Sequence, residues 1–222
     1  GAGLSWAGMI SMIISAGTVV SSLASDALTA RLGPGRVTAI SVGTTAAALF
    51  GFSTCTAFWQ LCLWAVPYGL GAGSVDASLN NYVALHYASR HMSWLHCMWG
   101  IGTMVSPMVM GAALTHGMHW TVGYRAIALF QVLLTVVLVV GLPLWKEPRT
   151  ESGTEETAPQ ALSLRQVFAL PGAREVMLCF FCYCALETTA GLWASSYLTL
   201  YKHIPMELAA KFASLFYIGI TA

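Results

Sequence analysis

Charged residues are scarce in this sequence of 222 residues. Lysine and arginine together number 10, and aspartate and glutamate 9, which makes 9% of the chain, whereas 57% is hydrophobic. A soluble domain carries about 25% charged residues because water must wet its surface. The formal net charge of +1 also lacks the basic excess that nucleic-acid binding requires. These shortages exclude a soluble enzyme and a nucleic-acid partner, and they predict an integral membrane protein that contacts the lipid bilayer.

Motifs for catalysis and metal binding are also missing. The sequence has no H-E-x-x-H motif and no glycine-rich phosphate loop of the kind that binds ATP. Cys179, Cys182 and Cys184 are close in sequence, but on a helix residues 182 and 184 point about 200° apart and cannot share one ion. We therefore expect no enzymatic activity, no metal site and no cofactor.

Long uncharged stretches are what the sequence has in abundance. Residues 37–75 carry no charge, and a stretch of that length makes two spans and a turn, because one helical crossing takes about 20 residues. The fold class that this predicts is an all-α polytopic membrane protein. The expected spans are 4–25, 37–53, 57–87, 94–114, 124–145 and 175–200, with a seventh that begins near Leu208. Because the chain starts at Gly1 and stops inside a span, we expect it to be truncated at both ends.

The distribution of basic residues predicts the orientation. If the loop 26–36 is cytoplasmic, the cytoplasmic loops hold seven basic residues and the other side three, which follows the positive-inside rule. The seven are Arg31, Arg36, Arg90, Lys146, Arg149, Arg165 and Arg174, against Arg125, Lys202 and Lys211. Residue 1 then lies outside, and one missing span ahead of it is the simplest interpretation if the true N-terminus is cytoplasmic.

One segment differs in composition from the rest. Residues 146–171 are rich in Glu, Ser, Thr, Gly and Pro, which is typical of a solvated linker. Its end, around Val167 and Phe168, is amphipathic and is expected to lie at the membrane surface. We expect three regions: an N-terminal bundle (1–145), a cytoplasmic linker between bundles (146–171) and the start of a C-terminal bundle (172–222).

Ionisable residues inside the spans are the candidates for function, since a charge at the bilayer centre costs about 2.5–3.5 kcal/mol and usually lines a functional cavity. Asp76 shares a helical face with Gly69, Gly73 and Asn80. Small residues on this face allow a neighbouring helix to approach closely, and the acid and amide then point to the same place. The alternative is an Asp that is hydrogen-bonded within its own bundle for structural reasons.

Two further spans have polar faces of this kind. His96 and Thr103 share a face of the fourth span, although His96 could also be a wetted residue near the span end. In the sixth span Tyr183 and Glu187 lie on one stripe, with Trp193 adjacent, and a structural role for the acid is the alternative there too. We expect all five to line a central cavity together with Asp76 and Asn80.

These residues resemble those of the major facilitator superfamily. The chain is similar to the first two-thirds of such a transporter, from its second helix to its eighth. The segment from Ser25 to Arg36 resembles the family's gating loop, usually G-x-x-x-D-R-x-G-R-K, with Ala30 in place of the Asp. The resemblance assigns gating roles to Asp26, Arg31, Gly33 and Arg36.

A narrower resemblance is to the fucose–proton symporter branch of sugar permeases. It is carried by Gly69-x-Gly71-x-Gly73-x-x-Asp76-x-x-x-Asn80, by Trp94-Leu-His-Cys-Met-Trp-Gly-x-Gly102, and by Tyr183-x-x-x-Glu187-x-x-x-Gly191-x-Trp193. It implies proton coupling through Asp76 and Glu187. It implies substrate binding by Asn80, His96, Thr103, Tyr183 and Trp193.

The sequence thus predicts a secondary active transporter that moves a small polar solute, a sugar in first place, by proton-coupled alternating access. Its partners are the substrate and protons, and we expect a monomer with several spans in the cell membrane. Two alternatives stay open: a multidrug–proton antiporter, and a non-transporting membrane sensor or scaffold with the same fold.

Overall fold

The computed structural model describes residues 4–145 and 164–221, and every regular element in these two ranges is helical. The chain divides into two compact units, residues 1–147 with 217–222 and residues 148–216. The predicted all-α class is confirmed. Most of the predicted linker lies outside the described residues.

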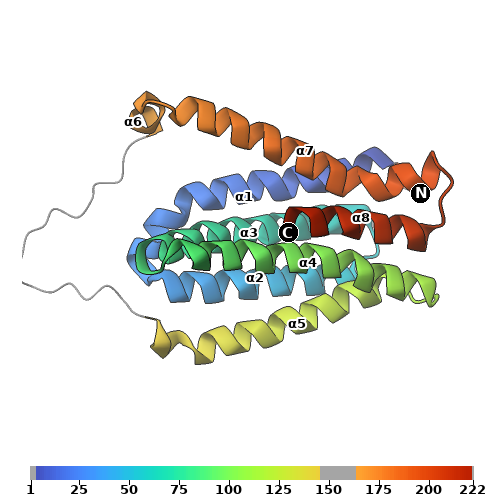
Figure 1. Ribbon diagram of the computed structural model, residues 1–222. Helices are drawn as coiled ribbons and strands as arrows, with labels where there is room; N and C mark the ends of the chain where they lie inside the picture. Colours follow the sequence, from blue (N-terminus) through green and yellow to red (C-terminus); the bar gives the residue numbers. More distant parts are fainter. Residues whose placement is uncertain (1–3, 146–163, 222) are drawn as a thin grey trace, which may run out of the picture. The chain divides into compact units, whose positions relative to one another are not determined.

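The first unit contains five long helices and a short 3-10 turn (Figure 1). They are α1 (Leu4–Leu32), α2 (Pro34–Thr54), α3 (Phe58–His86), α4 (Ser89–Thr115), α5 (Trp120–Val140) and η1 (Leu142–Leu144). The main packing is of α3 against α1 and α2, and of α2 against α5. Helix α4 is held more loosely, by smaller contacts with α5 and α3.

Helices α1 and α3 pack closely because glycines and small hydroxyl residues line their contact. A Cβ added to Gly69 or Gly73 would collide with the backbone carbonyls of Ile14 or Thr18. The hydroxyl of Ser22 donates a hydrogen bond of 3.2 Å to the carbonyl of Gly73 across the contact. In membranes such small residues let backbones approach and gain dispersion energy. The contact fixes the orientation of α3.

Helix α2 is the interior element of this unit. Thirteen of its 21 residues are buried, among them Leu49 and Phe52, which form an apolar core with Ala65 of α3 and Ala128 of α5. A further Cβ on Gly71 of α3 would lie 2.7 Å from the carbonyl oxygen of Ser41, so α2 and α3 also pack nearly backbone to backbone.

The predicted ends of several spans are wrong. The first was expected to end at residue 25, but α1 continues to Leu32, so the expected loop 26–36 is reduced to Gly33. Residues such as Ala27, Leu28 and Ala30 favour a helix. The helix stops where Gly33 takes a φ of 81° and Pro34 occupies the first turn of α2. The charges of Asp26, Arg31 and Arg36 show where the apolar span ends, but they give no information about where the helix ends.

Similar shifts occur in the fourth and fifth helices. Helix α4 begins five residues before the expected 94, and α5 runs from Trp120 to Val140 instead of 124–145. The third span was expected to reach residue 87, but α3 ends at His86, and Tyr87 follows it with extended backbone, φ −131° and ψ 161°.

The second unit contains α6 (Leu164–Ala169) and α7 (Ala173–Leu200), and most of α8 (Met206–Thr221). The short α6 covers the stretch that was expected to be amphipathic, and α8 begins two residues before the expected Leu208. Gly172 precedes α7 with a φ of 80°, a left-handed conformation that glycine adopts without strain.

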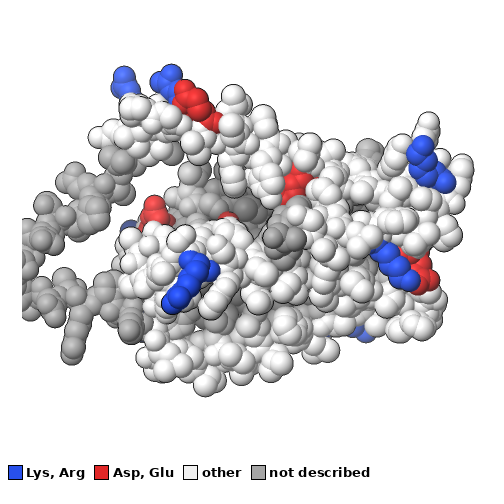
Figure 2. Space-filling model, in the orientation of Figure 1, with Lys and Arg blue, Asp and Glu red and all other residues white. Residues whose placement is uncertain are grey.

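Five of the described helices are long and apolar enough to cross a membrane: α1, α2, α4, α5 and α7. Helix α3 has 29 residues but is not one of these five, and it carries Asp76, Asn80 and several glycines. Its contacts with α1 and α2 account for this composition, because neighbouring helices replace lipid on two of its sides. Over the first unit, Figure 2 shows a surface that is nearly free of charge between the helix ends.

Candidate functional site

Asp76 and Asn80 lie one turn apart on α3 and bond to each other. The Asn80 Nδ2 group donates a hydrogen bond of 3.1 Å to the Asp76 Oδ1 atom. Asp76 stands 10 residues before the last residue of α3, or about 15 Å along the axis at 1.5 Å per residue. Its side chain is exposed and that of Asn80 half-buried. The shared face that their spacing predicts is therefore present, well inside the length of the helix.

Asn80 also carries an unpartnered group. Its Oδ1 atom is buried, and no hydrogen-bond donor reaches it among the described residues. A buried acceptor without a donor is costly, so such an atom needs an explanation. The orphan oxygen lies on the same amide group that binds Asp76, and this places an unused acceptor next to the acid.

The neighbouring faces of α1 and α3 hold this pair in place. The Ser25 hydroxyl donates to the Ser74 carbonyl at 3.4 Å, and the Thr29 hydroxyl donates to the Ser78 hydroxyl at 3.4 Å. These bonds lie one turn or less from Asp76 and fix the rotation of α3 about its axis. The acid consequently sits beside a rigid contact between helices.

The two residues predicted on α4 take different places. His96 is exposed and lies seven residues after the first residue of α4, deeper than expected because the helix starts earlier. Thr103 is half-buried and donates its hydroxyl to the Gly100 carbonyl of its own helix at 2.8 Å. Within the described residues neither side chain bonds to Asp76 or Asn80, so their roles in binding stay predictions.

The four predicted gating residues surround the break between the first two helices. Asp26 and Arg31 are exposed on the last turns of α1, Gly33 forms the break, and Arg36 is exposed in the first turn of α2. The Gly33 N–H donates to the Thr29 carbonyl at 2.9 Å. Because of this tight turn, α2 follows α1 without an intervening loop, and Arg31 and Arg36 stand on either side of Gly33.

In the second unit, Tyr183, Glu187 and Trp193 all belong to α7. Glu187 and Trp193 are half-buried and Tyr183 is exposed. The Tyr183 hydroxyl is near enough to the Glu187 carboxylate, one turn away, to interact with it. The stripe of tyrosine and acid that the sequence predicts is present on α7. That this stripe faces Asp76 stays a prediction.

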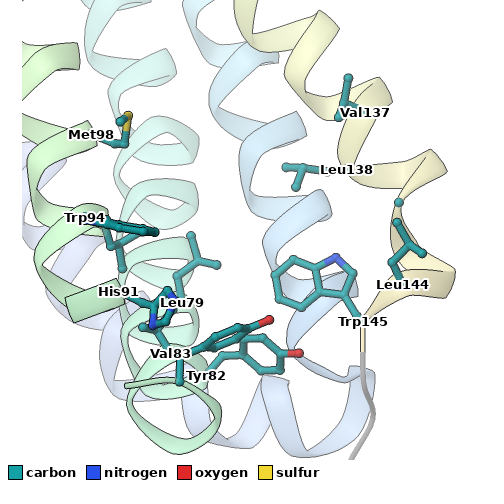
Figure 3. A pocket seen from close by; sticks show the side chains of 13 residues that line it. Leu79, Tyr82, Val83, His91, Trp94, Met98, Val137, Leu138, Leu144 and Trp145 are labelled. Atoms are coloured by element: carbon teal, nitrogen blue, oxygen red, sulfur yellow. The ribbon is translucent and has the colours of Figure 1, made fainter. Parts of the chain in front are cut away.

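An aromatic groove, not anticipated from the sequence, opens between the ends of α3, α4 and α5 (Figure 3). It encloses about 660 Å³, within the range of about 300–1,000 Å³ that is usual for ligand sites. Its aromatic wall consists of Tyr82, Tyr87, His91, Trp94 and Trp145. The residues come from three helix ends and one turn. In the sequence, only the gathering of aromatic residues near the span ends could have suggested the groove.

A polar bridge within the apolar helices was missed as well. The Thr45 hydroxyl of α2 donates a hydrogen bond of 2.8 Å to the Oε1 atom of Gln131 in α5. Gln131 is an uncharged amide between the apolar residues Phe130 and Val132 of α5. A search for all polar residues in spans, instead of ionisable ones alone, would have found it.

Comparison with known proteins adds one match. The family model described as Major Facilitator Superfamily matches residues 1–222. A search of curated proteins found no match for the chain.

Proposed function

Because the chain belongs to the Major Facilitator Superfamily, a family of membrane transporters, we propose that it moves a small polar solute together with protons, by alternating access. A sugar is the first choice of solute. The proposal names Asp76 and Glu187 as proton-coupling groups and Asn80, His96, Thr103, Tyr183 and Trp193 as substrate-binding groups.

The observation that carries the proposal is the Asp76–Asn80 pair. Asp76 is an exposed acid set back from both ends of α3, and a carboxylate in contact with lipid would be costly. Such a group is stable only if it faces a wet cavity or another helix. This supports a polar pathway along the α3 face that carries Asp76.

Asn80 gives the pair a way to accept either protonation state. With the carboxylate charged, the amide Nδ2 group donates to it, as observed. With Asp76 protonated, its O–H can donate to the orphan Oδ1 atom of Asn80 after the amide turns over. One amide would thus stabilise the acid before and after proton loading, which suits a group that binds and releases a proton in each cycle.

Glu187 gives the second unit its own acid. An acid in each bundle lets protonation bias the rocking of one bundle against the other, as in transporters that alternate around a central site. The hydroxyl, amide and indole groups of Tyr183, Asn80 and Trp193 can bind hydroxyl groups and the apolar face of an uncharged ring.

A second candidate is a multidrug–proton antiporter, and the aromatic groove favours it. The rings of Tyr82, Trp94 and Trp145 offer faces for a lipophilic cation. The described residues that line the groove include no acid, whereas cation sites commonly need one. Sugar symport therefore remains the first choice.

The test uses the full-length protein in liposomes with a pH-sensitive dye in the lumen. Under symport, fucose or glucose added outside carries protons inward and acidifies the lumen. Under exchange, tetraphenylphosphonium entering from outside drives protons out and makes the lumen alkaline. No luminal pH change with either probe contradicts both candidates.

Asp76→Asn should abolish proton movement while the protein still inserts, because the amide keeps the shape and cannot titrate. Glu175→Gln is the matched control, since Glu175 is an exposed acid in the first turn of α7, and it should leave the flux unchanged. Undiminished uphill uptake by Asp76→Asn would exclude this acid as the coupling group.

A further inference from the structure

Trp145 stands at the junction of three helix ends in the first unit. It follows η1, and its backbone N–H donates a hydrogen bond of 3.2 Å to the Leu142 carbonyl. Its side chain lines the aromatic groove and also a second cavity of about 360 Å³, formed with Gly33, Pro34 and Gly35. The indole therefore forms a wall between the two cavities.

One face of the indole is pressed against the start of α2. A Cβ added to the buried Gly35 would lie 2.7 Å from Cγ and 2.9 Å from Cδ2 of Trp145, closer than side chains pack. Only a glycine leaves room for the ring at this point. The Gly33 turn thus rests directly on Trp145: of the proposed gating residues, Gly33 lies two residues before Gly35 and Arg36 one residue after it.

The indole also contacts the end of α3. Its ring centroid lies 4.9 Å from that of Tyr82, which is buried and stacks on His86 at 4.4 Å. In Figure 3 the indole reaches toward Tyr82 across the end of the groove. Tyr82 is two residues beyond Asn80 on the same helix. One side chain thereby joins the Gly33 turn to the helix of the Asp76–Asn80 pair.

We propose that Trp145 is a positioning residue that couples the Gly33 turn to α3, so that a change at Asp76 is transmitted to the turn. The proposal rests on the transport function proposed above. The space around the ring limits its movement: the Gly35 backbone blocks one face, whereas the groove of about 660 Å³ and the cavity of about 360 Å³ leave room on other sides. If the turn moves toward the ring, it displaces the indole and alters the contact of the indole with Tyr82.

The first experiment measures coupling without transport. Ala30, exposed near the end of α1, is replaced by Cys in the purified full-length protein. Its reaction rate with a maleimide is followed by mass spectrometry of the peptide that contains it. Asp76→Asn should change this rate at least about twofold when Trp145 is present, and the change should vanish with Trp145→Ala. An equal change in both backgrounds, or no change in either, overturns the proposal.

The second experiment is a double-mutant cycle. Gly35→Ala should slow maximal proton-driven uptake at least about threefold with little change in KM, because the new Cβ displaces the indole; in the Trp145→Ala background the same substitution should have no effect. Gly102→Ala is the matched control, since a Cβ there meets nothing within 4 Å. Additive effects of the two substitutions overturn the proposal.

The two experiments also separate this inference from the proposed function. If maleimide labelling shows the coupling but no probe drives proton flux, the transport proposal fails and the role of Trp145 stands. If the protein with Asp76 intact shows normal proton flux and the labelling shows no coupling, only the proposed role of Trp145 fails, and the transport proposal stands.

Discussion

Helices α2 and α5 have the same length, 21 residues, and pack against each other, yet their burial is opposite. Thirteen residues of α2 are buried, but only Gly123 and Ala128 of α5 are. Helix α5 is nevertheless the more apolar of the two. The interior helix is therefore the less apolar one, which reverses the rule for soluble proteins.

The reversal follows from the solvent. Lipid tails are as apolar as leucine, so burial of a large apolar residue brings little gain, while small residues allow helices to pack closely. Helix α2 is rich in Gly, Ala, Ser and Thr, and α5 presents Leu and Val outward. Residue size, more than hydropathy, distinguishes the interior from the exposed surface here.

The largest effect is expected from a large residue on the interior helix. Ala48 of α2 is fully buried, at 0% exposure, so Ala48→Leu should destabilise the protein by about 1–3 kcal/mol through overpacking. The measurement is thermal unfolding of the full-length protein in detergent. Val136→Leu, on the exposed side of α5, is the control and should leave the midpoint unchanged. Equal midpoints for the two variants would contradict the assignment of interior and exterior.

A smaller effect is expected from the polar bridge between the same two helices. Thr45→Val removes the hydrogen bond to Gln131, and hydrogen bonds between membrane helices average about 0.6 kcal/mol. Thr44→Val is the matched control, because the Thr44 hydroxyl bonds to the Ile40 carbonyl of its own helix. Thermal unfolding should distinguish them, with Thr45→Val the less stable. If Thr44→Val is equally destabilised, the bridge contributes nothing specific.

Much of the fold was predictable because uncharged stretches mark the helices. Helix ends were harder: α1 extends to Leu32 on good helix formers, and the stop depends on the backbone of Gly33. The family match to residues 1–222 confirms the superfamily resemblance. Local helix periodicity was also sufficient to place Asp76 and Asn80 on one face, in agreement with their hydrogen bond.

Contacts between distant residues were not predictable from one sequence. Gly35 and Trp145 meet although 110 residues separate them, and Thr45 meets Gln131 for reasons of helix packing. Neither pattern nor composition carries information about such pairs. The proton and substrate roles of the candidate residues stay predictions, because they depend on the ligand that these side chains bind.

The smallest effect is expected where a large residue is removed from the exposed side of α5. Leu133 of α5 is 61% exposed, so in Leu133→Ala the lipid tails can fill the space that the side chain leaves. The change in unfolding free energy should stay within about 0.5 kcal/mol, as at surface positions generally. Leu49→Ala is the comparison, because Leu49 lies in the core with Phe52, where no lipid can enter and a cavity would remain. Thermal unfolding in lipid nanodiscs measures both. If Leu133→Ala is as destabilised as Leu49→Ala, that side of α5 packs against protein in the full-length molecule, and its exposed leucines and valines are an interface instead of a lipid-facing surface.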